Sequence, residues 1–162
     1  MNAHKQEVLC LIVDNNYGIL TRIASLFSRK GYNIDTLTVS TTDNPRISRI
    51  TMTVSGERAD IDQIIAQCEK LEEVRQVTVL SLENAVLREI ALVKLATSPE
   101  KLSQAMELCN VFKGNVVSLT TDSLIVEITG KPAKVDAFID IIKSYGITEL
   151  SRSGATAMAR VD

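Results

Sequence analysis

The stretch that decides the fold is residues 7–41, EVLCLIVDNNYGILTRIASLFSRKGYNIDTLTVST, in which three different patterns follow one another. Residues 7–13 form a near-continuous apolar run of strand length, and the turn-forming sequence DNNYG ends it. From Ile19 the apolar residues recur at helical spacing as far as Gly31, a residue typical of helix ends. Residues 33–41 again have strand character. We therefore expect a strand buried on both faces, an amphipathic helix of about three turns, and a second strand.

The residues that follow complete one structural unit. Residues 42–46 (TDNPR) predict a turn, and in residues 48–55 the side chains Ile50, Met52 and Val54 alternate with polar ones. This alternation predicts a third strand with one covered and one uncovered face. A second helical stripe comes next, and residues 74–80 predict a fourth strand. The predicted order of the unit is βαββαβ.

The same order is repeated further along the chain. Residues 81–88 (SLENAVLR) are a candidate linker, after which residues 89–96 have strand character. Ser98 and Pro99 predict the N-cap and first position of a helix that ends at Gly114.

The last 50 residues supply the remaining elements of the repeat. Residues 116–129 predict a hairpin, residues 131–145 a second helix and residues 147–151 a last strand. The predicted fold class is α+β, with two tandem ferredoxin-like βαββαβ units, each an antiparallel sheet with both helices on one face. The expected domains are residues 1–80, a linker at residues 81–88, and residues 89–162.

Composition limits the classes of function. The 162 residues carry 18 Lys and Arg against 20 Asp and Glu, a formal net charge of −2, so no strong field for nucleic acid or membranes follows. The longest apolar runs are far short of a membrane span, and the polar start at residues 1–7 is followed by no signal-peptide pattern. We therefore expect a soluble, cytoplasmic protein.

Catalytic and metal-binding residues are scarce. The one histidine, His4, lies in a terminal segment that we expect to be frayed. Cys10, Cys68 and Cys109 lie in apolar runs without metal-ligand spacing, so we expect reduced core thiols and no metal site. No Gly-rich phosphate-binding loop occurs. The sequence therefore argues against an enzyme acting by itself, and we assign no catalytic residue and no cofactor to this chain.

The loop between the first strand and the first helix is the strongest candidate binding site. The amides of Gly18, Ile19 and Leu20 are first-turn donors at the positive end of the helix dipole, so they favour a small carboxylate. The alternative is an ordinary helix cap made by the side chain of Asn15 or Asn16. A second patch, residues 30–34 (KGYNI), is equally compatible with a helix end followed by strand entry.

The second strand of this motif usually lies at the edge of the sheet, so residues 33–41 are where we expect two copies to pair. The alternative is that the polar side chains of Thr36, Thr38 and Ser40 keep that edge hydrated and the protein monomeric.

Several long motifs resemble one family, the small regulatory subunit of acetohydroxyacid synthase, also called acetolactate synthase. They are DNNYGILTRIASLFSRKGYNIDTLTVS (residues 14–40), DNPRISRITMTV (residues 43–54), REIALVK (residues 88–94) and the terminal RSG (residues 152–154). The resemblance covers nearly the whole chain and is more specific than the amino-acid-binding (ACT) domain pattern within it. Tyr17 departs from the family, which more often has a small residue or proline there.

The resemblance implies an N-terminal ACT domain that binds valine or another branched-chain amino acid, leucine or isoleucine. It also implies a C-terminal domain that engages a separate catalytic subunit, which holds thiamine diphosphate, Mg²⁺ and FAD and joins two pyruvate molecules into 2-acetolactate with loss of CO₂. Feedback inhibition by valine in branched-chain amino acid biosynthesis is implied with it. The effector-binding residues that it implies are Asn15, Gly18, Ile19 and Leu20, with Asn33 and Ile34 from the neighbouring protomer.

Three other classes share the βαββαβ order and are disfavoured by the residues. An RNA-recognition module stacks bases on aromatic side chains of its third strand, and RITMTV and LIVEIT contain none. An acylphosphatase-like enzyme needs a basic phosphate loop after its first strand, and a metal carrier needs paired cysteines there, whereas this loop begins DNN. A stand-alone amino-acid sensor that acts on some other enzyme remains the alternative.

Overall fold

The computed structural model describes residues 5–81, 84–96 and 98–161. These residues form two compact units: the first contains residues up to Val86 together with those from Gly154 onward, and the second contains Leu87–Ser153. His4 lies outside the described residues.

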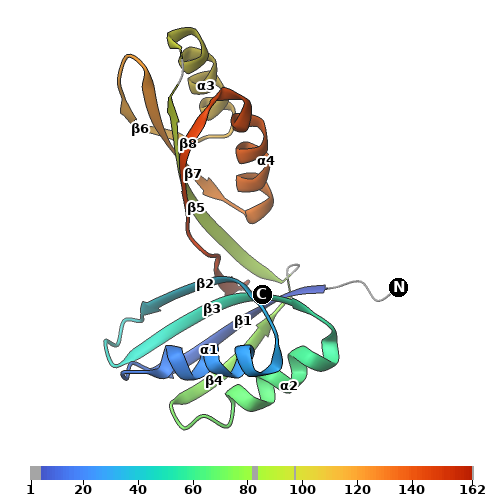
Figure 1. The fold of residues 1–162 in the computed structure, drawn as a ribbon. Coiled ribbons are helices and arrows are strands. Elements are labelled where there is room, and N and C mark those ends of the chain that lie inside the picture. The colour runs from blue at the N-terminus through green and yellow to red at the C-terminus, as the bar shows by residue number, and fades with distance from the viewer. Residues whose placement is uncertain (1–4, 82–83, 97, 162) are drawn as a thin grey trace. The chain divides into compact units, whose positions relative to one another are not determined.

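The first unit has the predicted βαββαβ order, with both helices on one face of its sheet (Figure 1). Its four antiparallel strands lie in the order β2-β3-β1-β4, so β1 is central and β2 is an edge. The elements are β1 (Lys5–Asp14), α1 (Ile19–Lys30), β2 (Ile34–Thr41), β3 (Ile47–Gly56), α2 (Arg58–Cys68) and β4 (Val74–Leu80).

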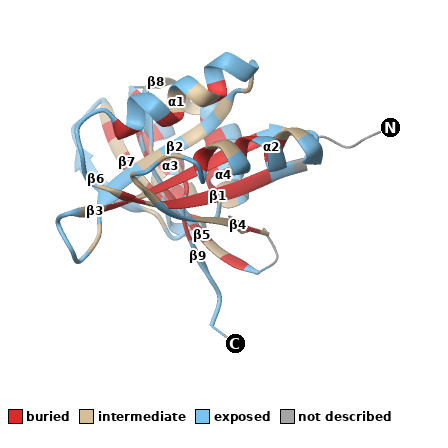
Figure 2. Ribbon diagram, turned by 90° about the horizontal axis from the view of Figure 1, so that it is seen from below, coloured by how far each residue is buried: buried red, intermediate tan, exposed pale blue. Residues whose placement is uncertain are grey.

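The core of this unit lies between the sheet and the two helices. Alternate residues of β1 and β3 face the helices and meet the buried side chains Ile19, Ile23 and Phe27 of α1. The strand β1 is buried on both faces over residues 7–11, in agreement with the red of its middle part in Figure 2, which confirms the prediction from its apolar run. Gly31 ends α1 in the left-handed conformation, with φ 72°, as its position predicted.

The second unit confirms the repeat and with it the predicted fold class. Its path of strands is β6-β7-β5-β8, and its core includes an edge-to-face pair of Phe112 and Phe138, with ring centroids 5.4 Å apart. The elements are β5 (Ala85–Ala96), α3 (Pro99–Val111), β6 (Asn115–Leu119), β7 (Ser123–Gly130), α4 (Pro132–Ile142), a 3₁₀ turn (Lys143–Tyr145) and β8 (Ile147–Arg152).

The structure differs from the predicted domain boundary in two respects. Residues 85–88 of the expected linker are not a loop, because β5 already begins at Ala85. The residues after Ser153 do not belong to the second unit: they return to the first one, where Thr156–Ala159 form a short strand, β9, that pairs with β5. Neither the early start of β5 nor the return of the last residues could be predicted from a local sequence pattern, because both depend on pairing with distant segments.

The residues after Ser153 also make the prediction for β3 partly wrong. Its alternation predicted one uncovered face, yet Thr51 and Thr53 on that face are buried. The reason is that residues 154–160, called here the C-terminal segment, lie over this face: Ala155 and Ala157 are buried there, and the Ala157 carbonyl accepts a hydrogen bond from Arg49.

Cys10, Cys68 and Cys109 are free and buried, which confirms that they are core thiols. Burial raises the pKa of the Cys68 thiol to about 11, with a smaller contribution from the charge of Glu69, and burial raises the pKa of Cys109 as well. Within the described residues no helix is long and apolar enough to cross a membrane.

Candidate effector site

The loop after β1 is held in place by the turn between β2 and β3. The Asn15 amide donates to the Arg46 carbonyl at 2.8 Å, and its side-chain Nδ2 donates to the Pro45 carbonyl at 3.0 Å. On the other side, Arg75 of β4 binds the carboxylate of Asp14 at 2.6 Å. The loop is therefore fixed before any ligand binds, which lowers the entropy cost of binding.

The start of α1 is open. Gly18 is the N-cap residue, in the left-handed conformation with φ 84°, and no side chain caps the helix, so the alternative of a cap by Asn15 or Asn16 is wrong. The Ile19 amide makes a long bond of 3.4 Å to the Asn16 carbonyl, and among the described residues the Gly18 and Leu20 amides have no acceptor.

Two further features favour an anion at this helix start. A Cβ placed on Gly18 would meet no atom within 4 Å, so the space beside the helix start is open. The first turn of α1 carries no acidic side chain, while Arg29 and Lys30 lie in its last turn. The amides and the helix dipole therefore face solvent without a competing carboxylate.

The side chains around this helix start differ in how far they are exposed. Ile19 is buried in the core, so it offers its amide and not its side chain, whereas Leu20 is 39% exposed and Tyr17 is fully exposed. Leu37 and Val39 of β2 are also exposed: they lie opposite Met52 and Ile50 on the sheet face that the helices cover. These two edge side chains were missed by the sequence analysis, although their spacing of two residues was the available signal.

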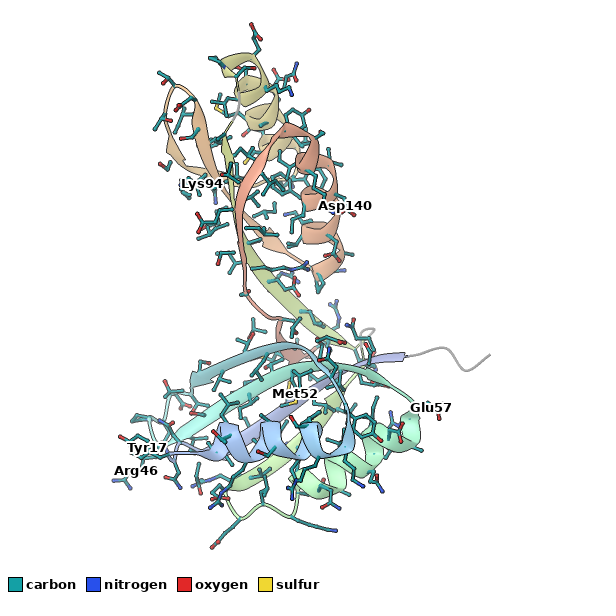
Figure 3. All side chains as sticks on the ribbon, in the orientation of Figure 1. Tyr17, Arg46, Met52, Glu57, Lys94 and Asp140 are labelled. Atoms are coloured by element: carbon teal, nitrogen blue, oxygen red, sulfur yellow. The ribbon has the colours of Figure 1, made fainter. Side chains whose placement is uncertain are left out.

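Asn33 and Ile34 lie at the other end of the sheet within one chain. Ile34 pairs with Val54, whereas Asp14 pairs with Ile47, and the 12 residues of α1 span about 18 Å between the two ends. Figure 3 shows Tyr17 and Arg46 together at one end of this unit and Glu57 at the other. The structure of one chain therefore does not bring the two predicted halves of the site together.

Asn33 belongs to a polar cluster around Asp35. The Asp35 carboxylate accepts hydrogen bonds from Ser55 at 2.6 Å, from Gln6 at 3.3 Å and from the Asn33 side-chain amide at 3.5 Å. Nearby, Tyr32 donates to Asp60, and this hydrogen bond raises the pKa of the tyrosine. The Asn33 bond is the longest of the set, so this side chain is the least restrained.

An open hollow of about 650 Å³ lies on the outer side of α1, lined by residues that include Thr21, Arg22, Ser25 and Leu71. Arg22 there forms an ion pair with Glu73. None of the six predicted effector residues lines this hollow, so it is distinct from the loop at Gly18.

In the second unit, charged side chains of three elements, all within the described residues, bind one another and form no open site. Glu89 of β5 is buried, and Arg152 of β8 donates to it through Nε, at 2.8 Å, and through Nη2. Arg152 Nη1 also donates to Asp136 at 2.6 Å. Burial by itself lowers the pKa of Arg152, but the bonds to Glu89 and Asp136 outweigh it and raise the pKa further.

Comparisons with known proteins agree over almost the whole chain. Residues 88–161 match the family described as the small subunit of acetolactate synthase, and residues 9–76 match the small-subunit-like ACT domain of acetohydroxyacid synthase. The chain is 41% identical to a probable acetolactate synthase small subunit of Archaeoglobus fulgidus over 96% of this chain and 97% of that one. It is 36% identical to the small subunit of Bacillus subtilis, over 96% of this chain and 91% of that one.

The fold is also found in a solved structure. The crystal structure of the acetolactate synthase small subunit from Thermotoga maritima superposes with a TM-score of 0.91 at 34% identity, over 98% of this chain and 99% of that one. The likeness therefore includes both units and the segments that connect them.

Proposed function

This chain belongs to the family of acetolactate synthase small subunits, and from that premise we propose that it activates the catalytic subunit and makes it sensitive to valine. The catalytic subunit is a separate chain that holds thiamine diphosphate, Mg²⁺ and FAD and forms 2-acetolactate from two pyruvate molecules. The family match extends over both units. It favours a regulatory subunit of this enzyme over a stand-alone sensor that acts on some other enzyme.

In this proposal the valine site forms when two chains pair along β2. Strand β2 lies at the edge of the described sheet, and its exposed Leu37 and Val39 would be covered by the second copy. In an antiparallel pair the first residue of one strand lies beside the last residue of the other. Asn33 and Ile34 of the second copy then reach the end of β2 at Thr41, which is also the end where the loop at Gly18 lies.

Each part of valine has a group of matching chemistry at such a site. The open amides of Gly18 and Leu20 bind the carboxylate, assisted by the helix dipole. The side-chain oxygens of Asn15 and of Asn33 from the second copy accept hydrogen bonds from the ammonium group. The branched side chain packs against exposed apolar residues such as Leu20 and Val39.

The observation that carries the proposal is the uncapped helix start at Gly18, and a matched pair of substitutions tests it. Gly18→Asp places a carboxylate where that of valine binds, while Gly18→Asn adds nearly the same bulk without charge, and both residues tolerate a positive φ. We expect valine dissociation constants from calorimetry to rise at least about 100-fold for Asp and about tenfold or less for Asn. Equal affinities of the two variants and the unsubstituted chain would contradict the site.

Mixed dimers test whether the site is shared between two chains. If a Gly18→Asp chain pairs with an Asn33→Ala chain, one of the two sites carries both substitutions and the other carries neither. Calorimetry on dimers purified through two different tags should then find one site of normal affinity per dimer. A site built within one chain would give no normal site, because each chain carries one damaging substitution.

A further inference from the structure

The C-terminal segment begins where the second unit fixes the chain most firmly. Just before it, Arg152 is bound to the buried Glu89, and Ser153 exchanges two hydrogen bonds with Ile90: its amide donates to the Ile90 carbonyl, and its hydroxyl accepts from the Ile90 amide, both at 3.0 Å. The terminal RSG and the REIALVK motif of the sequence therefore meet here. The next residue, Gly154, already belongs to the first unit.

Gly154 packs directly against the edge strand β2. A Cβ at this position would lie 2.6 Å from Thr38 Oγ1 and 2.8 Å from the Leu37 carbonyl oxygen, distances that no side chain can occupy. The segment is therefore seated against the backbone of the strand along which we propose that two chains pair, and only glycine permits this approach.

Beyond Gly154 the segment is held by the pairing of β9 with β5, by a hydrogen bond from the Arg160 amide to the Asn84 carbonyl at 3.0 Å, and by a few side-chain contacts. Ala155 and Ala157 are its buried side chains, and each contributes only a methyl group to the contact. Arg49 donates through Nη2 to the Ala157 carbonyl at 2.8 Å, and the Cys10 thiol lies 3.9 Å from the same oxygen. Arg49 belongs to the DNPRISRITMTV motif, and no carboxylate within the described residues forms an ion pair with it.

The contact beneath the segment is also incomplete. Thr38 Oγ1 and Arg49 Nε are buried without a hydrogen-bond partner among the described residues. Buried polar atoms without partners favour any state in which water reaches them. Lifting the segment would hydrate both atoms, which offsets part of the cost of breaking the pairing of β9 with β5 and of uncovering Cys10.

We propose that the C-terminal segment is a two-state element that couples valine binding in the first unit to the second unit. This inference rests on the proposed function, since valine bound beside β2 fixes the position of Leu37 and Thr38, against which Gly154 packs. The same segment is continuous with Ser153 and Arg152, so its seated state restrains the end of β8. An element with two discrete arrangements that both sites bias is what allosteric coupling requires.

Gly154→Val tests this inference, with Thr156→Val as the matched control, because Thr156 lies in the same segment but is exposed. In hydrogen exchange of the full chain, the amides of residues 156–159 should exchange at least tenfold faster in Gly154→Val and be unchanged in Thr156→Val. Because the coupling is reciprocal, the valine dissociation constant of the free chain should rise about 5-fold or more in Gly154→Val and stay unchanged in Thr156→Val. In the reconstituted holoenzyme, saturating valine should no longer inhibit Gly154→Val, while it inhibits Thr156→Val normally.

Arg49→Gln provides a second route if Gly154→Val does not fold, because it removes the bond to Ala157 without adding bulk. It should give the same three results: faster amide exchange of residues 156–159, weaker valine binding and weaker inhibition. Faster exchange with unchanged inhibition in either variant would overturn the coupling, as would equal exchange in Gly154→Val and Thr156→Val. Failure of the unsubstituted chain to bind valine would instead overturn the proposed function, and the coupling inference would fall with it.

Discussion

The two units share one order of elements but begin their first helices differently. In the first unit α1 starts from Gly18, with φ 84° and with amides that face open space. In the second unit α3 starts from Ser98 in an extended conformation, and Pro99 at the first helical position has no N–H to offer. The comparison teaches that the fold alone does not create an anion site: the residues at the strand-to-helix loop decide which copy offers free amides.

A second difference concerns a buried glutamate that both units place in their first strand. Glu7 of β1 and Glu89 of β5 are each buried. Glu7 accepts one hydrogen bond, at 3.4 Å, from Arg58, whose side chain is exposed. Glu89 accepts two hydrogen bonds from Arg152, whose side chain is only 30% exposed. The second unit therefore depends more on its arginine than the first unit does.

The largest expected effect tests this dependence. Arg152→Ala leaves Glu89 buried without its main partner, so it should cost about 3–5 kcal/mol of unfolding free energy. Arg58→Ala, the matched control in the first unit, should cost about 1 kcal/mol or less, because its arginine is exposed. Denaturant unfolding of both variants measures the two costs. Equal costs would mean that the two glutamates are satisfied to the same degree.

An intermediate effect is expected at the helix start of the first unit. Gly18→Ala should cost about 1–2 kcal/mol, because an L-residue is strained at φ 84° even though its Cβ has space. Gly56 at the end of β3 has no positive φ, and a Cβ there would meet Ile61 at an ordinary 3.9 Å. Gly56→Ala should therefore be neutral or stabilising by up to about 1 kcal/mol. Thermal unfolding of the two variants compares them, and similar shifts would argue against backbone strain at Gly18.

The smallest effect is expected from the buried thiol of the first unit. Burial raises the pKa of the Cys68 thiol in the folded chain to about 11 from its ordinary value of 9.0, so the unfolded chain loses this proton first as the pH rises. The neutral thiol therefore contributes its full share of the unfolding free energy below pH 9, and this share is lost as the pH rises from 9 to 11. At pH 10 the loss is about 1 kcal/mol. Unfolding at pH 7 and pH 10 should show a larger loss of stability in the unsubstituted chain than in Cys68→Ala, in which the raised pKa values of Cys109 and Tyr32 remain. The same pH dependence in both would contradict it.

The sequence predicted the features that depend on local patterns. The apolar run before Asp14, the helical spacing after Ile19 and the stop at Gly31 each involve residues close in the chain, and the structure has all of them. The Gly18 amide was predicted as a free first-turn donor, but the left-handed conformation of Gly18 was not predicted, since a cap by Asn15 or Asn16 was also compatible with the local sequence.

The features that were not predicted depend on residues far apart in the chain. Glu89 and Arg152 are 63 residues apart, and no local pattern relates them. The burial of Thr51 could not be seen from the alternation of β3, because the cover comes from Ala157 more than 100 residues later. In the sequence Leu37 and Val39 look like ordinary strand residues. Their exposure follows from the order of the strands, which places β2 at an edge that the helices do not cover.

The return of the C-terminal segment to the first unit has a consequence for biosynthesis. Residues 5–80 leave the ribosome first, yet their sheet is not fully covered until residues 154–160 have been made, after the whole second unit. At about 5–20 residues per second this interval lasts several seconds. During it the open face around Cys10 and Thr51 and the free edge at β2 are both exposed on the nascent chain. Early encounter with a second nascent copy, or with a chaperone that binds exposed strands, would therefore protect the half-covered unit while synthesis is finished.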